Sequence, residues 1–135
     1  MSTTWEQLEG AALSLARSGT IKDRLIDAYR NHLALVNAEE LPEGLREDFR
    51  ACHEALTRER PLRGEDAVRA TVRKMSSQEA DEVACGVMRL FAALVRELMR
   101  EEVSAEPALL VNGNGASAAA ARVKMLKAVP QVIAR

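Results

Sequence analysis

Hydrophobic positions recur every three or four residues along most of the chain, which is the period of an amphipathic α-helix. Near the N-terminus, four apolar residues share one helical face: Trp5, Leu8, Ala12 and Leu15. Thr3 precedes Glu6 by the spacing of a capping box. Gly19 favours a helix exit, because glycine tolerates the left-handed turn found there. The pattern predicts a first helix that begins after Thr3 or Thr4 and ends before Gly19.

Two further helices are predicted in the first half of the chain. Thr20 is a favourable N-cap for the second, which we expect to run to an exit at Asn37. Its apolar stripe comprises Ile21, Leu25, Tyr29, Leu33 and Val36. The third begins at Leu41-Pro42-Glu43, since proline is tolerated in a first turn, and ends near Arg60. Its apolar face comprises Leu41, Leu45, Phe49, Cys52 and Leu56.

A short helix is predicted from Gly64 to Met75, and the longest helix from about Ser77 to Val103. The Ser76–Glu79 capping box marks a new start between them. Steps of three and four residues, the spacing of a coiled-coil seam, connect Ala84, Val87, Phe91, Leu94 and Leu98. The apolar arc is widened on both sides by Val83, Met88, Val95 and Met99. Such a wide arc predicts a central position in the fold, or burial against a second subunit.

The composition changes after residue 104. Glu106-Pro107 interrupts the helical pattern, and residues 112–115 are rich in turn formers. A last short helix, basic on one side, is predicted from Ala118 to Val129. The whole pattern predicts an all-α protein, an antiparallel helical bundle of about five helices with a long final core helix. Residues 1–104 would form the bundle, and residues 105–135 a linker plus a basic amphipathic segment that is flexible or docked.

Composition narrows the class of protein. Hydrophobic residues make up 47% of the 135 residues and charged residues 29%, with a net charge of −1. This balance is typical of a soluble globular protein and argues against nucleic acid or an anionic membrane as a partner. No apolar run is long enough to span a membrane, and the N-terminus does not have the pattern of a signal peptide. Two cysteines are too few for a disulfide framework, so we expect a cytoplasmic protein.

Catalytic and metal motifs are sparse. The histidines, His32 and His53, and the cysteines, Cys52 and Cys85, occur without the paired spacings of a zinc site. The chain has no phosphate-binding loop and no nucleophile elbow. We therefore expect no catalytic, cofactor-binding or metal site, and no enzyme activity. The alternative, a small-molecule-binding or enzymatic bundle, would require a buried polar pocket around Tyr29, His32 or His53.

Charges are segregated along the chain although they nearly cancel. Acidic residues dominate residues 39–54 and 79–106, whereas basic residues gather between them. The basic set comprises Arg58, Arg60, Arg63, Arg69, Arg73 and Lys74. One interpretation is a docking surface for an acidic partner. The other is a solvated face whose residues make weak surface ion pairs.

A helix-turn-helix is a second alternative, at about residues 66–84. Ala70, Met75, Ala80 and Val83 have the offsets of its packing residues. The would-be recognition helix, however, begins with three carboxylates: Glu79, Asp81 and Glu82. Carboxylates facing the groove would repel DNA phosphates, so a DNA-binding regulator is the less favoured hypothesis.

By elimination, the sequence favours a non-enzymatic interaction or regulatory protein that acts through protein–protein contacts as a homodimer. The long final helix is the expected dimer seam, through Ala84, Val87, Phe91, Leu94 and Leu98. The partner is expected to be a protein or a second copy of the chain.

Overall fold

A computed structural model describes residues 3–105. The chain divides into two units between Glu97 and Leu98. The packing described below is that of the first unit. The last helix crosses the division.

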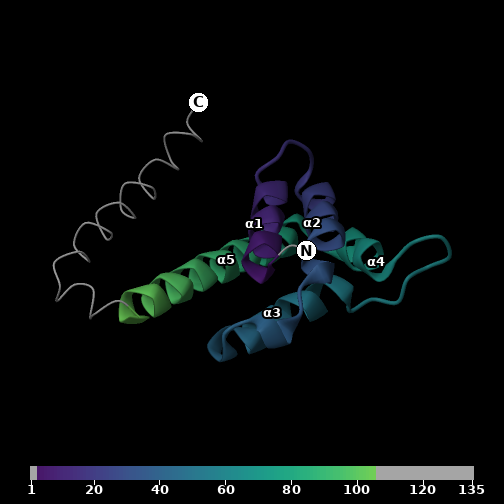
Figure 1. Cartoon of the computed structure of the whole chain (residues 1–135). Coiled ribbons are helices and arrows are strands. Elements are labelled where there is room, and N and C mark those ends of the chain that lie inside the picture. The colour runs from purple at the N-terminus through teal and green to yellow at the C-terminus, as the bar shows by residue number, and fades with distance from the viewer. Residues whose placement is uncertain (1–2, 106–135) are drawn as a thin grey trace. The chain divides into compact units, whose positions relative to one another are not determined.

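Helices make up most of the described residues, and no strand occurs among them (Figure 1). The α-helices are α1 (Thr4–Leu15), α2 (Ile21–Asn31), α3 (Glu43–Thr57), α4 (Ala67–Lys74) and α5 (Ser77–Ala105). Two short 3₁₀ turns, Leu33–Leu35 and Ala38–Glu40, connect α2 to α3. The predicted all-α bundle of five helices with a long final helix is confirmed. The predicted short helix after Ala118 lies outside the described residues.

Side-chain caps begin most of these helices. Thr3 Oγ1 accepts from the backbone N–H of Glu6 at 3.4 Å, and Thr20 Oγ1 from that of Asp23 at 3.1 Å. Ser76 Oγ accepts from the N–H of Glu79 at 3.1 Å. Each cap satisfies one of the N–H groups that a first turn leaves without an intrahelical partner. The predicted starts of α1, α2 and α5 are therefore confirmed.

The second helix is shorter than predicted. It ends at Asn31, because His32 leaves the helical conformation at φ −136° and ψ −62°. Leu33 remains 2% exposed within the following 3₁₀ turn, so the apolar stripe continues although the α-helix does not. The His32 imidazole lies so close to α1 that a Cβ on Gly10 would come within 2.4 Å of Nδ1. Glycine at this position permits the contact.

The loop between α3 and α4 is longer than predicted. The third helix ends at Thr57 rather than near Arg60, and α4 begins at Ala67 rather than Gly64. Asp66 is the actual N-cap of α4, accepting from the N–H of Arg69 at 3.2 Å. Gly64 has a φ of +85°, which places it in the turn closed by the bond from Glu65 N–H to Leu62 O at 3.1 Å. Its backbone conformation thus belongs to the turn and not to a helix.

The core is almost entirely aliphatic. α1 packs on α2, and α4 packs on both α2 and α3. The first part of α5 contributes five buried residues to this core: Ala80, Ala84, Val87, Leu90 and Leu94. Among the described residues Thr71 is the one buried polar side chain; its hydroxyl donates to Ala67 O at 2.8 Å and accepts from Glu59 N–H at 3.0 Å. The first part of α5 is therefore a core helix, as predicted.

Candidate interaction site

The residues predicted to form a dimer seam lie mostly inside the bundle. Val87 and Leu94 are 0% and 3% exposed, and Ala84 is also buried. Phe91 is half-buried, as is Leu98, which lies beyond the division of the chain. Most of this seam is therefore covered by the chain itself. Leu90, which the periodicity did not single out, is also buried.

A second apolar line follows the neighbouring face of α5. Steps of three, four and three residues connect Cys85, Met88, Ala92 and Val95, so these side chains share one helical face. Cys85 is exposed and Met88 is 45% exposed, whereas Ala92 and Val95 are half-buried. We call these four residues the outer stripe. The apolar arc of α5 is therefore wider than the part that the rest of the bundle covers.

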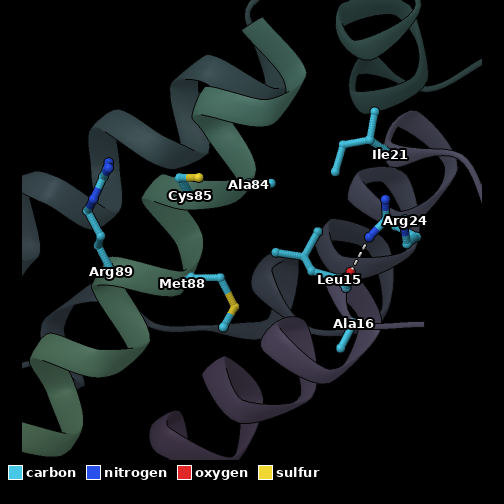
Figure 2. Close-up of a pocket in the computed structure, with 8 residues that line it drawn as sticks. All are labelled: Leu15, Ala16, Ile21, Arg24, Ala84, Cys85, Met88 and Arg89. Atoms are coloured by element: carbon cyan, nitrogen blue, oxygen red, sulfur yellow. Dashed lines mark hydrogen bonds between the residues drawn. The ribbon is translucent and has the colours of Figure 1, made fainter. Parts of the chain in front are cut away.

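An apolar groove of about 400 Å³ borders the outer stripe on the side of α1 and α2 (Figure 2). Met88 projects into it from α5 and Leu15 from α1, with Ile21 at the start of α2 (Figure 2). Its full lining is Leu15, Ala16, Ile21, Arg24, Ala84, Cys85, Met88 and Arg89. Aliphatic walls with an exposed methionine suit an apolar side chain from a partner.

The Arg24 guanidinium fixes the polar wall of this groove. It donates from Nε to Gly19 O at 3.1 Å. It also donates from Nη1 to Leu15 O, and this bond is the dashed line in Figure 2. The bond to Leu15 gives a donor to the carbonyl of the last residue of α1, which has no intrahelical partner, and the bond to Gly19 holds the turn before α2. The groove wall is therefore held in place by the same contacts that end the helix.

A second groove of about 400 Å³ lies between α3 and α5. It is lined by Asp48, Ala51, Cys52, Gly86, Arg89, Leu90, Ala93 and Arg96. Burial raises the pKa of the Cys52 thiol to about 11, so this thiol stays protonated at neutral pH and is a poor nucleophile. Arg89 lines both grooves, so the exposed part of α5 is a ridge between them.

The predicted partner-binding basic set is divided by the fold. Three members are engaged: Arg58 with Glu79 at 3.4 Å, Arg73 with Glu65 at 2.9 Å, and Lys74 with Glu59 at 2.9 Å. The other three are exposed and have no ion-pair partner among residues 3–103: Arg60, Arg63 and Arg69. Half of the basic charge is thus offset locally, while half remains available to an acidic partner.

The spacing of hydrophobic residues gave no sign of the ion pair between Arg30 and Asp66. Arg30 donates from Nε and Nη2 to the two carboxylate oxygens of Asp66, both at 2.7 Å. This bond, with help from the Arg69 N–H, lowers the pKa of Asp66 to about 2. The pair connects α2 to the start of α4. Because the two residues are 36 positions apart, no local sequence signal marks it.

The residues considered for catalysis form no buried polar site. The exposed His53 ring lies 5.4 Å from Tyr29 and 6.3 Å from Phe49, between ring centroids. A cavity of about 260 Å³ beside it is lined by Leu33, Ala34, Val36, Asn37, Ala38, Phe49, Arg50 and His53. Within the described part of the chain, no cluster of His, Cys, Asp or Glu could hold a metal ion. Every buried side-chain polar atom described there has a hydrogen-bond partner. The enzymatic alternative stays a prediction.

The corner between α4 and α5 contains the residues of the predicted helix-turn-helix. Ala70, Met75 and Ala80 are buried, and Val83 is half-buried. The carboxylates at the start of α5, on Glu79, Asp81 and Glu82, are exposed. DNA binding also stays a prediction, and this acidic surface disfavours it.

In comparisons with known proteins, no family model, curated protein or solved structure matches the chain. Of the helices in the described residues, none combines the length and apolarity needed to cross a membrane.

Proposed function

We propose that the chain is a non-enzymatic interaction or regulatory protein that acts through protein–protein contacts as a homodimer. One observation carries the proposal: the outer stripe leaves Cys85 and Met88 exposed beside an apolar groove, on a helix whose opposite side forms the core. Because Val87 and Leu94 are already buried within the chain, the contact surface we propose is the outer stripe rather than the deeper seam.

Apolar burial would supply the driving force for association. Each square ångström of apolar surface removed from water contributes about 25 cal/mol. Methionine is suited to such a contact, since its flexible thioether side chain adapts to the shape of its partner. The grooves on either side of α5 would receive side chains from the opposing surface.

Other features agree with a binding role. The single buried polar residue described, Thr71, has both of its hydrogen-bond functions satisfied within the fold, which leaves it no free group for chemistry. The exposed cations Arg60, Arg63 and Arg69 offer a second surface, for an acidic protein partner. Both cysteines are free thiols, which suits a reducing compartment such as the cytoplasm.

A pair of matched substitutions tests the proposal. Met88→Glu places a charge on the outer stripe, whereas Leu35→Glu places one at a residue that is 64% exposed and lies in the 3₁₀ turn. We expect Met88→Glu to raise the dimer dissociation constant at least tenfold and Leu35→Glu to leave it unchanged, measured by sedimentation equilibrium. A dimer that survives Met88→Glu unchanged would contradict the assignment of the surface, and a wild-type monomer at all concentrations would contradict the homodimer.

A further inference from the structure

We infer that the partner on the outer stripe is a second copy of the chain whose α5 runs antiparallel, with the two-fold axis crossing the outer stripe at the level of Leu90 along the helix. The inference rests on the proposed function and adds the orientation and register of the pair. It is carried by the sizes of the apolar side chains along the stripe and by the placement of charge along its edge.

The sizes of the outer-stripe residues are complementary about Leu90. Met88 and Ala92 lie two residues to either side of it, and Cys85 and Val95 lie five residues to either side. In a two-fold antiparallel pair, residues equidistant from the axis face one another. Met88 of each copy therefore meets Ala92 of the other, a long side chain against a small one. Parallel pairing would instead oppose Met88 to Met88 and Ala92 to Ala92.

The charged edge of the stripe supports the same orientation. Glu82, Arg89 and Arg96 recur every seven residues, so they follow one edge of the outer stripe, and all three are exposed. Glu82 lies eight residues before the level of Leu90 and Arg96 six residues after it. Antiparallel pairing therefore brings Glu82 of each copy within about 3 Å, along the helix, of the level of Arg96 of the other, an offset that these long side chains can span. Glu82 accepts one bond, from Gln78 Nε2 at 3.3 Å, and Arg96 has no ion-pair partner among residues 3–103. Both groups are thus available to an opposing chain.

Parallel pairing offers this edge no such partner. In a parallel pair, the charged edge of one copy would face the other edge of the outer stripe in the second copy. That other edge carries Ala84 and Phe91 and no carboxylate. In the antiparallel pair the two Arg89 side chains approach each other near the axis. Asp48 lines the same groove as Arg89, and so places a carboxylate close to this concentration of positive charge.

Disulfide trapping tests the register. In the full chain carrying Cys52→Ala and Val95→Cys, the native Cys85 would lie opposite the introduced thiol of the second copy, close enough for a disulfide bond. Within one chain these two positions are about 15 Å apart along the helix, too far to bond. We expect mild oxidation to give a covalent dimer whose peptide map links Cys85 to position 95. The matched control, Cys52→Ala alone, holds its two Cys85 thiols about 15 Å apart and should not cross-link.

Each outcome of the trapping is decisive. A Cys85–Cys85 link in the control would show parallel pairing and overturn the inference while leaving the homodimer intact. A dimer by light scattering that cannot be trapped through position 95 would also overturn the register alone. A monomer in all variants, with circular dichroism showing an intact helical fold, would overturn both the inference and the proposed function.

Charge reversal gives an independent measurement of the same pairing. We expect Glu82→Arg and Arg96→Glu each to raise the dimer dissociation constant on the order of tenfold, since two symmetry-related pairs are lost. The double reversal restores the pairing with opposite signs and should return the constant to within about threefold of wild type. Additive weakening in the double variant would contradict the contact between Glu82 and Arg96.

Discussion

The corner where α4 meets α2 and α3 differs from the outer stripe of α5 in how its side chains are partnered. At the corner, Asp66 is paired with Arg30, Glu65 with Arg73, and the Thr71 hydroxyl with two backbone groups. Along the outer stripe, Cys85 and Met88 are exposed and Ala92 and Val95 are half-buried. The first surface has its strong interactions within the chain, whereas the second leaves apolar area uncovered.

This difference indicates where a partner gains free energy. A partner at the engaged part of the corner would have to displace hydrogen bonds that already exist, and exposed ion pairs contribute little in exchange. A partner on the outer stripe would only displace water from apolar groups. Substitutions at the corner should therefore change the stability of the fold, and those on the outer stripe should change association.

The largest loss of stability is expected on the core side of α5, and a much smaller loss on its outer stripe. Leu90 is 4% exposed, so Leu90→Ala removes core packing and should lower the free energy of unfolding by about 2–5 kcal/mol. Met88→Ala, two residues earlier, removes a side chain that is 45% exposed and should cost under about 1 kcal/mol at concentrations where the protein is monomeric. Urea denaturation measures both. Equal losses would contradict the division of α5 into a core side and an outer stripe.

The next effect concerns the buried hydroxyl at the corner. Thr71→Val keeps the shape of the side chain but removes the acceptor of the Glu59 N–H, and should destabilise the fold by about 1–2 kcal/mol. Thr71→Ser retains the hydroxyl and serves as the control, so it should lose less. Chemical denaturation of the two variants provides the measurement, and a Val variant as stable as wild type would show that water satisfies this N–H.

An effect of similar size is expected at Asp66, which caps α4 and pairs with Arg30. Asp66→Ala loses both interactions and should cost about 1–2 kcal/mol, whereas Asp66→Asn keeps a capping oxygen and should cost about half as much. Thermal unfolding at neutral pH compares the two variants. If Asn proves as damaging as Ala, the cap contributes nothing.

Asp66 also makes the stability of the fold depend on pH. Its pKa in the folded protein is about 2, below the ordinary value of 3.8, so ionised Asp66 stabilises the fold above about pH 4. That contribution is lost as the pH falls from about 4 through 2. The wild-type protein should therefore lose more stability over this interval than Asp66→Asn. Parallel acid titrations followed by circular dichroism would show it; identical slopes would contradict the shift.

Helical periodicity and capping spacings predicted α1, the start of α2 and the long core helix α5 correctly, because these depend on residues close in the chain. They could not predict that α2 ends at Asn31, since Leu33 continues the stripe from a 3₁₀ turn. Nor could they predict the Arg30–Asp66 pair, which joins residues 36 positions apart. Periodicity also gave the full width of the apolar arc on α5, but only the packing of α1, α2 and α3 shows which part remains exposed.

Light scattering on the full chain, with wild type and Met88→Glu measured side by side, shows whether two copies associate through the outer stripe. A homodimer formed through the outer stripe has a wild-type mass of twice the 14.8 kDa of the chain, and we expect the mass to shift toward 14.8 kDa in the variant. A wild-type protein that stays at 14.8 kDa at every concentration, or a variant that remains fully dimeric, would contradict it.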